Sequence, residues 1–182
     1  MNDNVLIDPT TAADGRKSVD AIFGAIEESL GFIPEGLKLY GISPPLLKSF
    51  VTAIGYFRSQ TRLSQELLAM IRYLSASRHD CRFCIDFNEA ILLQLGKELD
   101  DIRASRENPG AAPLSDKEKA LLKYALDALN EPDAIDEART EALREQGWSD
   151  RDIFEATYVA ANNRAFTTML KTFKLHRQGQ LE

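Results

Sequence analysis

Apolar residues recur at helical spacing along most of the chain, and no stretch alternates with the period of two that a half-buried strand requires. Ser115 and Glu118 have the spacing of a capping box, and Ser149 and Asp152 repeat the Ser-x-x-acid pattern. The clearest apolar stripe, after Ser43-Pro44-Pro45, consists of Leu46, Leu47, Phe50, Val51, Ile54 and Phe57. The sequence therefore predicts an all-α fold.

Helix start and stop signals place the individual elements. We predict helices over residues 18–30, 34–40, 81–95, 136–146 and 150–173, and others beginning at Ser43, Ser64 and Ser115. In the helix from Ser64, the inward face is predicted to be Leu67, Leu68, Ile71 and Leu74; in the helix over 81–95, it is Phe87, Ile91 and Leu95. A length of 182 residues suits one domain. We expect an irregular arm over residues 1–17, one helical domain over 18–175 and a polar tail over 176–182.

The composition excludes several classes of function. The net charge is -6 and the pI is about 5.1, without a stripe of Lys and Arg. Nucleic acid and anionic membrane surfaces both need clustered cations, so neither is an expected partner. The start, Met1-Asn2-Asp3-Asn4, lacks the basic and apolar regions of a signal peptide, and no apolar run approaches the length of a membrane helix. We expect a soluble cytoplasmic protein.

Both cysteines of the chain stand in one Cys-x-x-Cys motif, Cys81 and Cys84. Two thiols about one helical turn apart can close a disulfide or bind a soft ion. In a reducing cytoplasm such a motif is more often catalytic or metal-binding than structural. Asp80 is a plausible N-cap of the following helix, which would put Cys81 in the first turn. There the helix dipole lowers the pKa of a thiol.

The alternatives for this motif are a redox pair, an inherited pair without turnover, and a metal site. A zinc site needs four ligands, and beyond the cysteines the sequence offers only His79 and the distant His176. Haem attachment needs His directly after the second cysteine, where Ile85 stands. We therefore expect neither a metal nor a cofactor. On a continuous helix Asn88 shares a face with both cysteines and is the predicted polar neighbour of Cys84.

Several short motifs together indicate a family. They are Ile33-Pro34, Ser43-Pro44-Pro45-Leu46-Leu47, Leu63-Ser64, the Cys81–Cys84 motif, and Ala161-Asn162-Asn163-Arg164-Ala165. In this order the pattern resembles the carboxymuconolactone decarboxylase superfamily, and within it the alkylhydroperoxidase D-like (AhpD-like) branch. The resemblance covers roughly residues 30–175.

The resemblance implies an oligomeric, all-helical bundle that reduces peroxides through its cysteine pair. By that resemblance the peroxide oxidises Cys84 to a sulfenic acid, and Cys81 then condenses with it to a disulfide. The partners it implies are a small hydroperoxide, an external dithiol reductant and further copies of the chain, with no cofactor. The position of Cys81 at the helix start favours Cys81 as the readier thiolate instead. We adopt the order that the resemblance implies, with Cys84 oxidised first and Cys81 as the resolving thiol.

The sequence departs from the family at two positions of its proton relay. Asn88 stands where the family has His, and Ala69 stands where it has Glu. An amide cannot accept a proton as a general base. Glu66, one turn before Ala69, is a candidate substitute, and His79 is a further candidate near the pair, although capping or solvation also explains it. The alternative functions are a non-enzymatic or ligand-binding oligomer and a lactone decarboxylase of the same superfamily.

Overall fold

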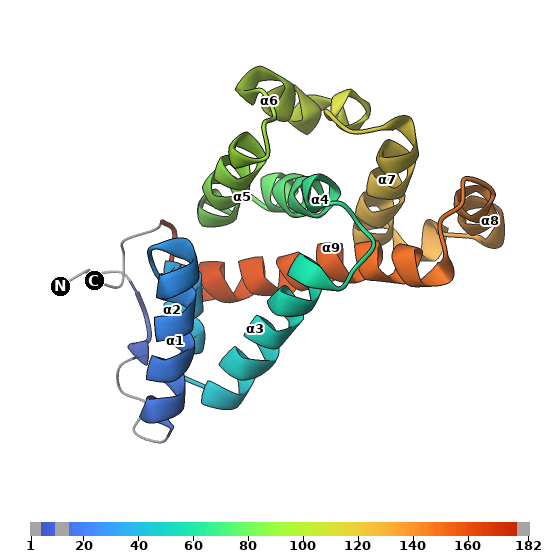
Figure 1. Cartoon of the computed structure of the whole chain (residues 1–182). Helices are drawn as coiled ribbons and strands as arrows, with labels where there is room; N and C mark the ends of the chain where they lie inside the picture. Colours follow the sequence, from blue (N-terminus) through green and yellow to red (C-terminus); the bar gives the residue numbers. More distant parts are fainter. Residues whose placement is uncertain (1–4, 10–14, 178–182) are drawn as a thin grey trace. The chain divides into compact units, whose positions relative to one another are not determined.

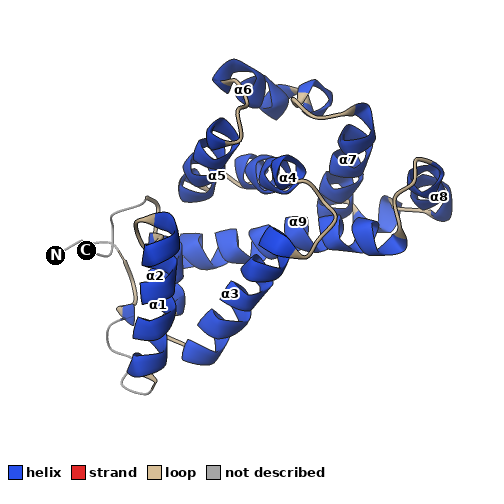
Figure 2. Ribbon diagram, viewed as in Figure 1, coloured by secondary structure: helices blue, strands red, loops and turns tan. Residues whose placement is uncertain are grey.

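The computed structural model describes residues 5–9 and 15–177. Within these ranges the chain is all-α, as predicted, and contains no strand (Figure 2). The helices are α1 (Arg16–Leu30), α2 (Glu35–Tyr40), α3 (Pro44–Ser59), α4 (Gln65–Arg78), α5 (Arg82–Gln94), α6 (Leu99–Glu107), α7 (Asp116–Asn130), α8 (Glu137–Glu145) and α9 (Asp150–Thr172). Short 3₁₀ turns cover Pro109–Ala111 and Pro132–Ala134. Most of the predicted arm and tail lies outside the described residues.

The chain divides into two compact units, which are described separately. The first holds the described residues up to Gln60 and those from Met169 onward, and includes α1, α2 and α3. Helix α1 begins two residues before the predicted start at Ser18, because the Gly15 carbonyl already accepts hydrogen bonds from the amides of Ser18 and Val19. Gly31 ends this helix in a left-handed conformation, as predicted.

The apolar stripe of α3 is only partly buried. Leu47 and Phe57 are buried, whereas Leu46 is 61% and Ile54 is 44% exposed. The predicted stripe is wider than the face that α1 and α2 cover within this unit.

The second unit, residues Thr61–Thr168, is organised around α4 (Figure 1). Helices α5, α6 and α7 surround it, and α9 runs below them in this view. The four residues of the predicted inward face are buried, and so are Ala69, Met70 and Tyr73. Because residues 67–71 and 73–76 are all buried, α4 is enclosed by protein around its circumference and lies at the centre of the core of this unit.

One glutamate ties the start of α4 to the start of α7. The predicted capping box is confirmed: the amide of Glu118 donates to Ser115 Oγ, and a Glu118 carboxylate oxygen accepts from the Ser115 amide. The other carboxylate oxygen accepts a 2.5 Å hydrogen bond from Ser64 Oγ, the N-cap of α4. Burial raises the pKa of Glu118, but these hydrogen bonds outweigh it and hold the pKa below its usual range.

A second carboxylate joins α5 to α4 and α6. Glu89 accepts hydrogen bonds from Tyr73 Oη at 3.1 Å, from Arg103 Nη2 at 3.0 Å and from Arg106 Nη2 at 2.9 Å. The Arg106 guanidinium also lies over the Tyr73 ring, 4.9 Å from its centre. These contacts fix the rotation of α5 about its own axis, and with it the direction of the cysteine face.

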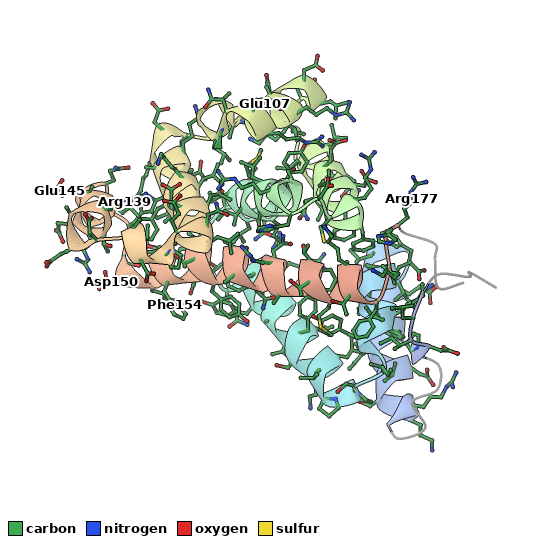
Figure 3. All side chains as sticks on the ribbon, turned by 180° about the vertical axis from the view of Figure 1, so that it is seen from behind. Glu107, Arg139, Glu145, Asp150, Phe154 and Arg177 are labelled. Carbon is green, nitrogen blue, oxygen red and sulfur yellow. The ribbon has the colours of Figure 1, made fainter. Side chains whose placement is uncertain are left out.

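Helix α9 carries exposed aromatic residues within the second unit. The Phe154 side chain projects from the helix and is 69% exposed (Figure 3), and Tyr158, one turn later, is 39% exposed. The predicted association into a homo-oligomer stays a prediction.

Candidate functional site

The turn between α4 and α5 positions the first cysteine. Asp80 has a φ of +55°, and the carbonyl of Ala76 accepts hydrogen bonds from the amides of His79 and Cys81. Asp80 therefore lies in a left-handed conformation at the end of α4. The prediction that Asp80 is the N-cap of α5 is wrong, because an N-cap needs an extended backbone. Cys81 takes the N-cap position instead, with φ -90° and ψ 92°.

The two sulfur atoms face each other across the first turn of α5. Cys81 Sγ and Cys84 Sγ are 2.6 Å apart, and no disulfide joins them. Cys81 is 3% exposed and Cys84 is 2% exposed. A disulfide has a bond length of about 2.05 Å, so its closure needs a movement of only about half an ångström. The pair is arranged for thiol–disulfide chemistry.

The buried residues of α5 are Phe83, Cys84, Ile85, Asn88 and Leu92. The predicted inward residues Phe87, Ile91 and Leu95 are only half-buried. The prediction followed hydropathy alone, whereas the neighbouring face carries a polar residue that finds its hydrogen bonds inside the protein.

Asn88 connects the cysteine helix to the centre of the unit. Its Nδ2 donates a 2.7 Å hydrogen bond to the backbone carbonyl of Cys84, and its Oδ1 accepts a 3.2 Å hydrogen bond from Arg72 Nε. Asn88 thus reaches Cys84 through the backbone and not through the sulfur. Both ends of the amide are engaged, so it holds the first turns of α5 in place against α4.

The polar group next to the Cys84 sulfur comes from α9, and the sequence analysis did not identify it. Thr167 Oγ1 lies 3.6 Å from Cys84 Sγ, and Thr167 is buried. One turn earlier, the buried Asn163 donates from Nδ2 to the carbonyl of Arg72 at 3.2 Å. In the sequence, the signal for this contact is the pair Asn163 and Thr167, two polar residues four positions apart that lie on the same face of one long helix.

The environment opposes ionisation of the Cys84 thiol. Its pKa is raised, first because it shares a hydrogen bond with Cys81 and second because it is buried; the Thr167 hydroxyl acts in the opposite direction. Burial also lowers the pKa of Arg72 to about 10, which leaves the guanidinium charged at neutral pH. The site therefore keeps the Cys84 thiol protonated and holds a cation next to Asn88, on the neighbouring helix α4.

The described contacts of two further predicted site residues, Glu66 and His79, do not include the sulfurs. Glu66 lies in the first turn of α4, six residues before Arg72 and therefore about 9 Å from it along the helix axis. Within the described residues no hydrogen bond joins Glu66 to either cysteine or to Asn88. His79 is the C-cap of α4, and its Nε2 lies 3.3 Å from Nη1 of Arg164 on α9.

No group of three or more His, Cys, Asp or Glu side chains suited to a metal ion occurs in residues 5–9 and 15–177. In the same ranges no helix combines the length and the apolarity needed to span a bilayer.

The comparisons with known proteins identify the fold. No family model and no curated protein matches the sequence. An uncharacterised peroxidase-related protein from Silicibacter sp. TM1040 superposes with a TM-score of 0.83, 23% identity and coverage of 98% of this chain and 96% of that one. An alkylhydroperoxidase AhpD core protein from Ralstonia eutropha JMP134 superposes with a TM-score of 0.81, 19% identity and coverage of 97% and 92%. The chain has the AhpD-like fold.

A third structure with the AhpD-like fold has a different described activity. It is a cysteine-to-alanine variant of the debrominase Bmp8 in complex with 2,3,4-tribromopyrrole, with a TM-score of 0.75, 19% identity and coverage of 98% of this chain and 94% of that one. At these identities the likeness confirms the predicted fold, and the chemistry has to be argued from the site.

Proposed function

We propose that the protein is a thiol-dependent oxidoreductase that reduces peroxides through Cys81 and Cys84. The observation that carries this proposal is the 2.6 Å separation of the two sulfurs at the start of α5. It is supported by the names of two structures with the same fold, which are described as peroxidase-related.

The reaction needs no group beyond the two thiols and two external reactants. A thiolate attacks the terminal oxygen of a hydroperoxide, the O–O bond breaks, and an alcohol leaves after taking up a proton. The sulfur, now a sulfenic acid, is attacked by the second thiol; the S–S bond forms and water leaves. An external dithiol then returns the two electrons by thiol–disulfide exchange and becomes a disulfide itself.

The order of attack follows the resemblance: Cys84 first, with Cys81 as the resolving thiol. The raised pKa of Cys84 opposes its ionisation in this order. Because the sulfurs are only 2.6 Å apart, transfer of the shared proton to Cys81 leaves the charge on Cys84. The Thr167 hydroxyl, 3.6 Å from Cys84 Sγ, favours that second arrangement by hydrogen bonding to the thiolate.

The experiment is rapid mixing of the reduced protein with hydrogen peroxide, with thiol loss followed over time. We expect two thiols per chain to disappear together, faster than free cysteine at the same pH. Cys81→Ser should stop at a sulfenic acid on Cys84, detected by a sulfenic-acid-specific reagent, and Cys84→Ser should form none. The double variant is the matched control. A wild-type rate no faster than that of free cysteine contradicts the proposal.

The rival is a non-enzymatic member of the fold that retains the cysteines. The near-complete burial of both sulfurs and the raised pKa of Cys84 favour it, because both reduce the supply of reactive thiolate. The same experiment separates the two: the rival predicts thiols that stay reduced in peroxide unless the protein is unfolded.

A further inference from the structure

Arg72 is a half-buried cation that has no acidic partner among the residues that the structure describes. It lies in the middle of the buried helix α4, and its side chain is half-buried. Its Nε donates to Asn88 Oδ1 at 3.2 Å, and no carboxylate in the described part of the chain forms an ion pair with it. An unpaired cation among protein groups is unfavourable, so arginines in such positions normally meet an anion.

The outer edge of this guanidinium is available to a ligand. Within the described residues, the two terminal nitrogens of Arg72 donate a hydrogen bond to no protein group. Among these residues Ser75 Oγ is the only side-chain polar atom that is both fully buried and without a hydrogen bond. Each terminal nitrogen of Arg72 therefore has some exposure to solvent. With Nε held by Asn88, the two terminal N–H groups form a planar fork. That fork matches the two oxygens of one carboxylate.

The same hydrogen bonds that hold Arg72 also hold the cysteine helix. Asn88 bonds to the carbonyl of Cys84, one helical turn earlier on α5, and Asn163 bonds to the carbonyl of Arg72. Residues one turn apart have Cβ atoms about 5–6 Å apart. The Arg72 guanidinium is thus linked to the backbone of Cys84 through the side chain of one residue, Asn88.

We propose that Arg72 binds the carboxylate of the substrate, and that the substrate is an organic hydroperoxide with a carboxylate a few carbons from its peroxide group. The second half of this inference rests on the proposed peroxide reduction, whereas the binding of a carboxylate does not. Arg82 shows the contrast: it is exposed on the same helix as the cysteines and already pairs with Asp86 at 3.2 Å.

The test uses a short-chain hydroperoxy carboxylic acid and its methyl ester, which differ only in the negative charge. For the wild type we expect the second-order rate constant of thiol oxidation to be about ten to a hundred times larger for the acid, the range for a charge-assisted hydrogen bond. Arg72→Gln should abolish this preference, and Arg72→Lys, which keeps the charge but loses the fork, should retain part of it. Arg82→Gln is the matched control and should retain all of it.

Binding is measured separately from activity, by calorimetry of pentanoate with the Cys81→Ser/Cys84→Ser protein, because this protein has no thiol chemistry. We expect pentanoate to bind and its methyl ester not to bind, and Arg72→Gln to abolish binding while circular dichroism shows an intact helical fold. Tighter binding of inorganic phosphate than of pentanoate, binding that survives Arg72→Gln, or no binding at all overturns the inference. If pentanoate binds but peroxide does not oxidise the thiols, the carboxylate site stands and the proposed function fails.

Discussion

Replacing Cys81 should lower the pKa of Cys84. The main cause of the raised pKa of Cys84 is the hydrogen bond with Cys81, followed by burial and the charge of the Cys81 thiolate. When Cys81→Ala removes the partner sulfur, two of these three causes disappear and only burial remains. The Cys84 thiol of the variant should therefore ionise at a lower pH than in the wild-type protein.

The separation of the sulfurs sets the size of this effect. Two unit charges 2.6 Å apart repel each other by about 6 kcal/mol at an effective dielectric constant of about 20. Since one pKa unit corresponds to about 1.4 kcal/mol, the second proton of the pair should leave about four to five pH units above the first. Burial acts on both steps and shifts both upward.

The assay is the ultraviolet absorbance of the thiolate during a pH titration of the reduced protein. We expect one thiolate per chain in the wild type up to strongly alkaline pH, and a single thiolate in Cys81→Ala that appears well below the second wild-type step. In the Cys84→Ala variant, the titration measures the ionisation of the Cys81 thiol alone. Two wild-type thiols that ionise within one pH unit of each other would refute the reasoning, because they would not share a proton.

Three further substitutions test the surroundings of the pair. Thr167→Val removes the hydroxyl next to Cys84 Sγ and should raise the pKa of Cys84, measured by the same titration in the Cys81→Ala background. Ser75→Ala removes a buried hydroxyl without a partner and should leave the free energy of unfolding in urea unchanged or raise it by up to about 1 kcal/mol; a clear loss would show that the hydroxyl is satisfied. Glu89→Gln should cost about 1–3 kcal/mol in the same assay at neutral pH. The pKa of Glu89 is lowered mainly by the hydrogen bond from Arg103. The ionised Glu89 therefore stabilises the fold above its unfolded pKa of about 4.3, and this stabilisation is lost as the pH falls through the folded value. The free energy of unfolding of Glu89→Gln should depend less on pH in this range.

The sequence predicts the fold well because its strongest signals are local. Ser64 and Ser115 are the N-caps of α4 and α7, and Gly31 ends α1, as their residue types indicate. The cysteine spacing likewise places the two sulfurs on one helical turn, since three residues along a helix determine that distance. Such features need only the neighbouring residues and the geometry of the helix.

The features that the sequence does not predict depend on contacts between distant segments. The Thr167 contact with Cys84 joins residues 83 positions apart, and nothing local connects them. The role of Asp80 was mistaken because a short polar residue suits both an N-cap and a left-handed helix end, and the turn to α5 selects the second. The inward face of α5 was mistaken because Asn88 is buried as a partner of Arg72, which hydropathy cannot anticipate.

Asn88, the polar residue one turn after Cys84, cannot move a proton in the site. An amide has no ionisation near neutral pH, and both ends of this amide are already used, by Arg72 and by the carbonyl of Cys84. The proton of the attacking thiol must therefore go to a group other than residue 88. The nearest acceptor is the sulfur of Cys81, 2.6 Å away, which is itself the thiol that later needs to lose a proton. In the proposed peroxide reduction, a Cys81 thiolate would take up this proton, so that the cysteine pair serves as its own relay, while Asn88 holds the first turns of α5 against α4.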